Sequence, residues 1–135
     1  MNDSQFKPEN LPKPTDAEVE ILSILWARGP SAVREVHDEI SANGRPIGYT
    51  TVLKQMQMMF EKGLLRRDES NRAHVYAAAI HQEQTQRQLV GDLLDKAFAG
   101  SAMNLVMQAL ATKRASAEEL SQIRELLDQH ERSGQ

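Results

Sequence analysis

The hydrophobic pattern of this chain changes its period at Gly63, and that change restricts the possible folds more than any other feature. Before Gly63, apolar residues recur every three or four positions in three successive stretches, which is typical of amphipathic helices. After Gly63 the helical period stops, and 64–67 and 73–77 are typical of two short β-strands joined by the polar residues 68–72. Three helices followed by one hairpin predict a winged helix-turn-helix, in which the third helix keeps one face free.

Capping residues and glycines indicate where these helices begin and end. We expect a first helix from a capping box at Thr15 and Glu18 to Gly29, a second from an N-cap at Ser31 to Asn43, and a third from Tyr49 to Lys62 with Gly63 as its C-cap. The predicted fold class is therefore mostly α with a small β wing. It is an N-terminal winged helix-turn-helix followed by C-terminal helices.

Positive charge is concentrated in the stretch that holds the third helix and the hairpin. The whole chain has a formal net charge of −3, yet residues 45–76 carry six basic and three acidic side chains, a net of +3. Hydroxyl, amide and ammonium groups on the free face of the helix are of the kind that bond phosphates and base edges. We therefore predict double-stranded DNA as a partner, contacted by Thr50, Thr51, Lys54, Gln57, Arg66, Arg67 and Arg72. The alternatives are an ordinary solvated helix face and a charged turn that Asp68 and Glu69 neutralise locally.

The segment after residue 80 is helical in pattern throughout and has more apolar surface than it can cover by itself. Its three amphipathic stretches are separated at Gly100 and at a capping box formed by Ser116 and Glu119. The simplest partner for such a stripe is the same stripe on a second copy, so we predict a two-fold homodimer. The predicted dimerisation residues are Leu89, Leu93, Leu94, Phe98, Leu105, Val106, Leu110, Leu120, Ile123 and Leu127.

These patterns divide the chain into three parts. We expect a flexible N-terminal segment over 1–14, a winged-helix DNA-binding domain over 15–80 and a helical dimerisation domain over 81–135. The first part lacks the apolar core of a signal peptide, and no run of about 18 apolar residues occurs in the chain. The sequence therefore predicts a soluble cytoplasmic protein without membrane insertion.

Several classes of chemistry are excluded by composition. The chain has no cysteine, which excludes disulfides, a thiol nucleophile and cysteine-ligated metals. Its four histidines (His37, His74, His81 and His130) are scattered without the spacing of metal ligands, and no glycine-rich phosphate loop is present. We predict no metal, no cofactor and no enzymatic activity.

Four segments of the chain together resemble the penicillinase repressor family, also called the BlaI/MecI/CopY family. They are LPKPTDAEVEILSILWARGPSAVREV from Leu11, GYTTVLKQMQMMFEKGLLRRDESNRAHVYAA from Gly48, LLDKAFAGSAMNLV from Leu93 and SAEELSQIRELLD from Ser116. The helix with Trp26, the YTTV entry, the EKGLL turn and the R-A-x-V-Y strand occur in the same order. The resemblance spans nearly the whole chain.

The resemblance implies a dimeric bacterial transcriptional repressor. Its winged helix would bind inverted-repeat operators with half-sites of the TACA/TGTA kind, and its C-terminal helices would dimerise. Carried over by position, Tyr49, Thr50, Thr51 and Lys54 would face the groove, and Arg72 with its wing neighbours would contact phosphates.

In the antibiotic-response branch, a membrane sensor protease triggers cleavage at an Asn-Phe pair, and Gln108 and Ala109 stand at that position here. The cysteine cluster of the copper-responsive branch is absent, which excludes copper sensing by that route.

Some questions stay open at this level. A winged helix that binds only proteins is the alternative to DNA binding, because the net charge of the chain is negative. Gln55 and Met58 stand where similar sequences commonly carry Leu and Arg, so DNA contacts at these two positions stay open. The residues do not identify the operator, the regulated genes, the inducer or the route of release.

Overall fold

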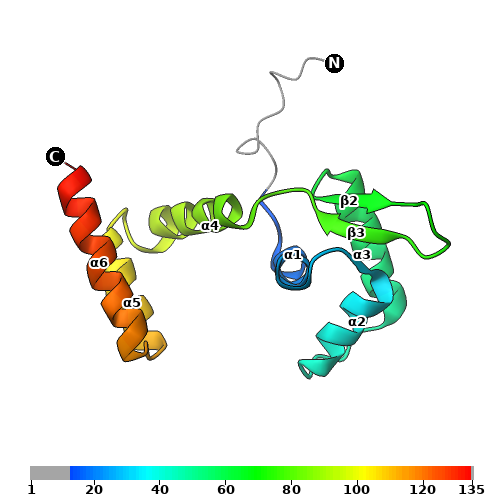
Figure 1. Ribbon diagram of the computed structural model, residues 1–135, viewed down its shortest axis with the longest axis horizontal. Helices are drawn as coiled ribbons and strands as arrows, with labels where there is room; N and C mark the ends of the chain where they lie inside the picture. Colours follow the sequence, from blue (N-terminus) through cyan, green and yellow to red (C-terminus); the bar gives the residue numbers. More distant parts are fainter. Residues whose placement is uncertain (1–12, 135) are drawn as a thin grey trace, which may run out of the picture. The chain divides into compact units, whose positions relative to one another are not determined.

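The computed structural model describes residues 13–134, and the chain divides into two compact units, Met1–Val90 and Gly91–Gln135. The first unit holds α1 (Asp16–Arg28), β1 (Ser31–Ala32), α2 (Val33–Ala42), α3 (Tyr49–Glu61), β2 (Leu65–Asp68) and β3 (Val75–Ala78). The boundary falls within α4 (Gln82–Ala97), and α5 (Ala102–Thr112) and α6 (Ala117–Ser133) belong to the second unit (Figure 1). The predicted class, mostly α with a small β wing, is confirmed. Most of the segment expected to be flexible, residues 1–12, lies outside the described range.

The first helix begins and ends as its sequence predicts. The Thr15 hydroxyl accepts the backbone N–H of Glu18 at 3.2 Å, and the Glu18 carboxylate accepts the backbone N–H of Thr15 at 2.9 Å. This reciprocal capping box satisfies two donors that the first turn would otherwise leave unpaired. At the other end, Gly29 adopts a φ of 89° and its N–H donates to the carbonyl of Leu25.

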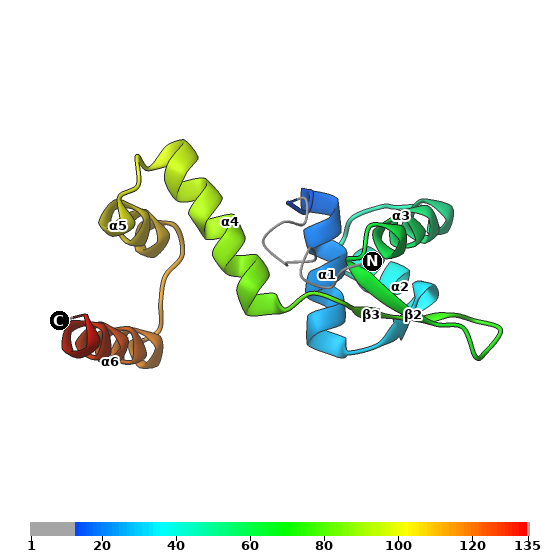
Figure 2. The ribbon, with the colours of Figure 1, turned by 90° about the horizontal axis from the view of Figure 1, so that it is seen from above.

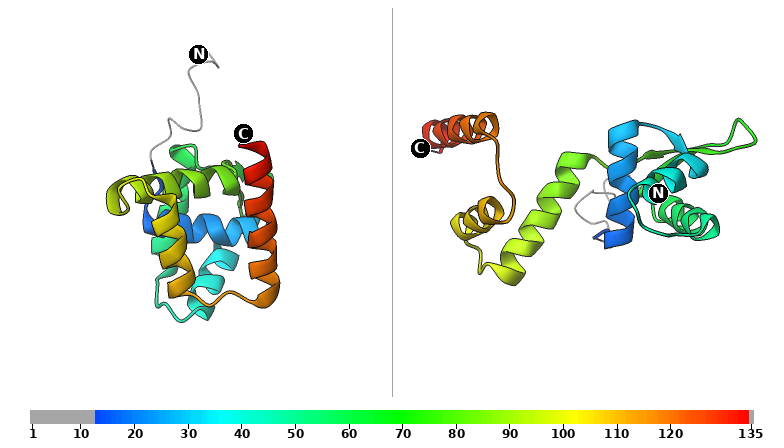
Figure 3. Two further views of the ribbon diagram at one scale, coloured as in Figure 1. Left: turned by 90° about the vertical axis from the view of Figure 1, so that its left-hand side faces the viewer. Right: turned by 90° about the horizontal axis from the view of Figure 1, so that it is seen from below.

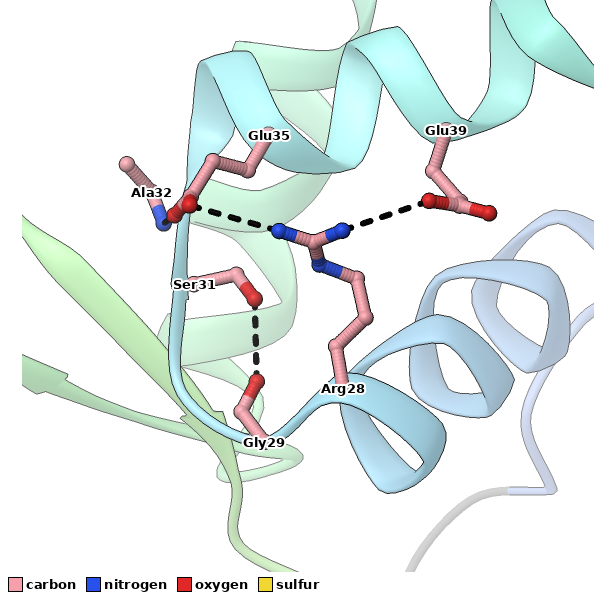
Figure 4. A network of polar contacts seen from close by, with 6 residues as sticks. All are labelled: Arg28, Gly29, Ser31, Ala32, Glu35 and Glu39. Atoms are coloured by element: carbon pink, nitrogen blue, oxygen red, sulfur yellow. Dashed lines mark hydrogen bonds and ion pairs between the residues drawn. The ribbon is translucent and has the colours of Figure 1, made fainter.

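A third strand, which the alternation of residues does not predict, changes the start of α2. β1 pairs antiparallel with β3, with Ser31 opposite Tyr76, and the sheet has the order β1-β3-β2. The prediction of Ser31 as the N-cap of α2 was therefore wrong: Ala32 is the N-cap, and the buried Ser31 hydroxyl donates to the Gly29 carbonyl (Figure 4). Because alanine has no side-chain acceptor, the Glu35 carboxylate supplies the cap by accepting the Ala32 N–H at 2.8 Å.

The third helix ends in a glycine turn that starts the hairpin. The C-cap is Lys62 rather than the predicted Gly63, which follows it with a φ of 88°. The Gly63 N–H donates to the Phe60 carbonyl and the Leu64 N–H to the Met59 carbonyl, which is the Schellman arrangement. The chain thus turns directly from α3 into β2, and β2 pairs with β3 so that Leu65 lies opposite Ala78.

The core of the first unit lies between the three helices and the inner face of the sheet. Its members come from all of these elements, and Trp26 is anchored at the edge because its indole N–H donates to the Ile80 carbonyl at 3.1 Å. Figure 2 shows the three helices gathered together with the hairpin beside them, and Figure 3 shows the loop of the hairpin projecting past the helices. The buried apolar residues are Ile21, Leu22, Ile24, Leu25, Val33, Val36, Ile40, Val52, Met56, Met59, Leu64, Leu65 and Tyr76.

The second unit has helices but no buried core. Ser101 and Ser116 cap α5 and α6 by accepting the backbone N–H groups of Asn104 and Glu119 at 3.1 and 3.0 Å. Among residues 91–134 not one side chain is fully buried. Large apolar side chains are exposed instead, with Met103 at 73% and Leu127 at 63% of their full accessibility. Within the described part of the chain, no helix combines the length and apolar character needed to cross a bilayer.

Candidate nucleic-acid interface

The predicted contact residues of the third helix share its solvent-exposed face. Val52, Met56 and Met59 are buried on the inner side of α3, at the spacing of one helix face. The other face carries two hydroxyls, an ammonium group and an amide, all exposed, and the exposed phenol of Tyr49 stands at the first helical position. These exposed residues are Tyr49, Thr50, Thr51, Lys54 and Gln57.

The start of α3 is held by two side chains of α2 that the sequence did not single out as contacts. The Arg34 guanidinium carbon lies 5.2 Å from the centre of the Tyr49 ring, and the His37 ring approaches the same ring edge-on at 5.9 Å. The His37 Nε2 atom is also 2.9 Å from the Ile47 carbonyl oxygen. Arg34 and His37 are three residues apart on a helix, a spacing that puts both on one face. The spacing can be read from the sequence, but it does not predict the contacts with Tyr49, because these depend on how α3 packs against α2.

The three arginines of the hairpin differ in their surroundings. Arg66 and Arg72 are exposed, whereas the Arg67 side chain lies 4.1 Å over the Phe60 ring and forms an ion pair with Glu69 at 2.5 Å. Hydrogen bonding to Tyr76 and then to Glu69 raises the pKa of Arg67 above its usual value. Arg67 therefore joins the hairpin to α3, and its charge is already engaged within the protein.

Other cations of the basic stretch are also engaged internally. The Lys62 ammonium lies 2.5 Å from the buried Glu18 carboxylate, and Arg45 forms an ion pair with Glu20. Burial by itself raises the pKa of Glu18, but hydrogen bonds from Lys62 and Thr15 and the positive charge of Lys62 outweigh it, so the pKa is lowered. Among the described residues, the cations of 45–76 without a carboxylate partner are Lys54, Arg66 and Arg72. All three are predicted contact residues.

A surface hollow of about 650 Å³ lies between α2, α3 and the hairpin. It brings Tyr49, Gln57 and Arg72 together with Arg34, a cation that the sequence did not assign to the site. Glu35 also borders the hollow, but its carboxylate accepts hydrogen bonds from Ala32 and Arg28, and Arg28 bonds Glu39 as well (Figure 4). The hollow therefore combines tyrosine rings, an amide and two guanidinium groups with the carboxylates of Glu35 and Asp38.

The residues predicted for dimerisation and cleavage lie on the C-terminal helices. Leu93, Val106, Leu110 and Leu127 are exposed. The other predicted dimerisation residues are partly buried: Leu89, Leu94, Phe98, Leu105, Leu120 and Ile123. Met103, Met107 and Leu126, which are not among the predicted dimerisation residues, are also exposed and lie near predicted residues on their helices. Gln108 and Ala109 are both exposed on α5.

Comparison with known proteins gives a consistent result. The penicillinase repressor family model matches residues 14–129. The transcriptional regulator BlaI of Mycobacterium tuberculosis is 35% identical over 83 residues, which are 61% of this chain and 59% of that protein. The chain thus spans about 59% of the length of these mycobacterial relatives.

Two further relatives align over more of the chain. The penicillinase repressor of Bacillus licheniformis is 22% identical over 122 residues, 90% of this chain and 94% of that protein. The methicillin resistance regulatory protein MecI of Staphylococcus epidermidis is 18% identical over 114 residues, 84% of this chain and 92% of that protein. These names describe regulators of transcription and not enzymes. Because the family model covers most of its length, this chain belongs to the penicillinase repressor family of transcriptional regulators.

Proposed function

We propose that this protein represses transcription by binding inverted-repeat operator DNA as a homodimer. The observation that carries the proposal is the distribution of unpaired positive charge within residues 45–76. Lys54, Arg66 and Arg72 have no carboxylate partner among the described residues, and they lie on the free face of α3 and on the hairpin. A recognition helix beside a basic wing is the arrangement that a duplex needs, because the helix enters the groove and the wing contacts the backbone.

The free face of α3 supplies the groups that would read bases. Thr50, Thr51 and Gln57 offer hydroxyls and an amide, which can bond base edges in the major groove, and a threonine methyl can contact a thymine methyl. Lys54 lies between them on the same face, and Tyr49 is exposed at the first helical position. We assign base recognition to α3 and phosphate contacts to Lys54 and the wing. Half-sites of the TACA/TGTA kind are the first candidates.

Dimerisation is proposed through the C-terminal helices, within the predicted domain 81–135. Support comes from the absence of any fully buried side chain among residues 91–134 and from the exposed apolar side chains of α5 and α6. Such surface is normally covered by a partner. A two-fold pair presents two recognition helices to two half-sites, and the linkage raises affinity through effective concentration.

Release of the operator would follow from separation of the two copies. Proteolysis at Gln108-Ala109, triggered by a membrane sensor protease in a response to antibiotics, is one proposed route, and the exposure of both residues on α5 is compatible with it. The inducer in this scheme is a β-lactam or another signal. A repressor acts where the chromosome is, so we propose the cytoplasm as its location.

The decisive experiment is a mobility-shift assay with the region upstream of the protein's own gene. We expect a shifted band that survives excess scrambled competitor and that corresponds to two protein chains per inverted repeat. Thr51→Ala should lower the affinity for the repeat while leaving the affinity for scrambled DNA unchanged, because the hydroxyl contacts a base and not a phosphate. Failure of the wild-type chain to bind any duplex at low salt would instead support a winged helix that binds proteins.

A further inference from the structure

We propose that His37 of α2 is a positioning residue that fixes the start of the recognition helix for base reading. The inference rests on the proposed function, because it assigns a role to a residue outside the DNA-contacting face. His37 lies on α2, and its side chain is 21% exposed. Besides its neighbour Asp38, the residues that its ring contacts are Ile47, in the turn before α3, and Tyr49, the first residue of α3.

The hydrogen bond of His37 reaches the point where α3 begins. Its Nε2 atom lies 2.9 Å from the carbonyl oxygen of Ile47, the residue before the N-cap Gly48, and Nδ1 lies 3.3 Å from the Asp38 carboxylate. A carbonyl can only accept, so Nε2 carries the hydrogen. Gly48 has no side chain to cap the helix, and its carbonyl alone receives the N–H groups of Thr51 and Val52 at 3.1 and 3.2 Å. The bond from His37 therefore holds the turn from outside the helix.

Ring contacts orient the side chain of Tyr49, the first residue of α3. The His37 ring meets the Tyr49 ring at 66°, with 5.9 Å between the ring centres, while the Arg34 guanidinium lies 5.2 Å from the same ring. Both contacts come from α2 and both act on the first residue of α3. Edge-to-face aromatic contacts and cation–π contacts of this kind favour one ring orientation.

The consequence of these contacts concerns the hydroxyls of Thr50 and Thr51. They follow Tyr49 directly, so a displacement of the first turn moves them relative to the base edges. Contacts to bases require placement within about 0.5 Å, whereas attraction to phosphates falls off slowly with distance. Loss of the His37 bond should therefore reduce sequence discrimination and leave general DNA affinity intact.

Two variants separate the hydrogen bond from the ring. His37→Phe keeps a ring beside Tyr49 and loses the donor, whereas His37→Gln keeps an N–H near the Nε2 position and loses the ring. The probes are the duplex that the wild-type chain enriches from a randomised library and a scrambled duplex of the same composition. For His37→Phe, we expect the ratio of the two affinities to fall about five- to tenfold, the effect of one hydrogen bond, with scrambled binding unchanged. His37→Gln should restore the ratio to within about twofold of wild type.

His81→Phe, at an exposed histidine before α4, is the matched control and should change neither affinity.

A second measurement decides the question without DNA. Amide hydrogen exchange at Thr51 and Val52 should be faster in His37→Phe than in the wild type and should return to the wild-type rate in His37→Gln. If the phenylalanine variant does not fold, His37→Ala takes its place. Unchanged exchange in the variant without the donor, an equal loss of affinity on both duplexes, or no rescue by glutamine overturns the inference. A wild-type chain that enriches no duplex refutes the proposed function alone, and the exchange rates still decide the role of His37.

Discussion

At the scale of single residues, basic side chains of one sequence stretch have two different roles. Lys62 and Arg67 are held by Glu18 and Glu69, and these pairs join α1 to α3 and fix the hairpin against Phe60. Lys54 and Arg72, by contrast, have no carboxylate partner among the described residues. A net charge of −3 for the whole chain therefore says little about DNA binding, because the cations of 45–76 that lack a carboxylate partner lie on α3 and the hairpin.

Replacing Arg72 and Arg67 in turn should separate these two roles. Arg72→Ala should weaken binding to every duplex and flatten the log–log salt dependence by about one unit, out of about −5 for a dimer with six phosphate contacts. Its melting temperature should not change. Arg67→Ala should lower the melting temperature, because it removes the contacts to Phe60 and Glu69. Affinity measured over a salt series and thermal unfolding test both statements, and an unchanged slope in Arg72→Ala removes that residue from the phosphate contacts.

The buried carboxylate of Glu18 should make stability depend on pH. Its pKa is lowered in the folded state, so its contribution is present above the ordinary glutamate pKa of about 4.3 and is lost as the pH falls through the lower folded value. Glu18→Gln should therefore lower the free energy of unfolding by about 1–3 kcal/mol at neutral pH. The difference from wild type should shrink under acidic conditions.

Urea unfolding at neutral and acidic pH measures this difference. Glu61→Gln, at an exposed position on α3, is the control and should have little effect at either pH. A difference between wild type and Glu18→Gln that persists unchanged in acid would contradict the assignment of the lowered pKa to Glu18.

At the scale of elements, the turn after α3 connects that helix to the hairpin. Gly63 occupies the left-handed region that side chains other than glycine rarely adopt, and two Schellman hydrogen bonds depend on that conformation. Because β2 begins two residues later, the direction of the hairpin relative to α3 is set here. The geometry that would let helix and wing contact one duplex depends on this turn.

Gly63→Ala should destabilise the first unit by about 1–2 kcal/mol, because a Cβ atom strains the left-handed backbone. Gly91→Ala is the matched control, since Gly91 lies inside α4 with open space around its Cα and no positive φ. It should stabilise the protein by up to about 1 kcal/mol. Chemical denaturation of both variants measures these changes, and equal effects at the two positions would show that backbone strain is not the cause.

At the scale of the whole molecule, the two units differ in how they are stabilised. The first has a core of buried apolar residues from three helices and the sheet, whereas residues 91–134 contain no fully buried side chain. A helical unit without a core needs a partner, because exposed apolar surface alone cannot offset the entropy lost on ordering the chain. The second unit is therefore expected to be stable only as part of an assembly.

Val106→Asp should convert the proposed dimer to monomers at about micromolar concentration, because it places a charge among exposed apolar side chains of α5. Asn104→Asp adds the same charge at an exposed polar position of the same helix and should leave the dimer intact. Sedimentation equilibrium measures the association state of both variants. A Val106→Asp variant that stays dimeric would move the interface away from α5.

The sequence predicted the helices and the hairpin of the first unit, but not every point at which they begin. Periodicity gave α1, α2, α3 and the hairpin, and the capping box at Thr15 is present as expected. The N-cap of α2 was wrong because β1 is only two residues long and its pairing with β3 is not local. A side chain with good capping propensity, Ser31, therefore lies in a strand. Local propensity does not include a partner that is about 45 positions away in the chain.

The sequence by itself determined the features that depend on residues close together in the chain. These are the helices, their exposed faces, the glycine turn and the concentration of basic residues. Only the tertiary structure decided which of those charges remain without a partner, because Lys62 meets Glu18 and Arg45 meets Glu20 across long stretches of chain. It also decided that Arg34 and His37 contact Tyr49, since α2 and α3 meet only when the core is packed. The physical reason is range: helix formation and capping act over a few residues, whereas ion pairing and ring contacts depend on which surfaces the fold brings together.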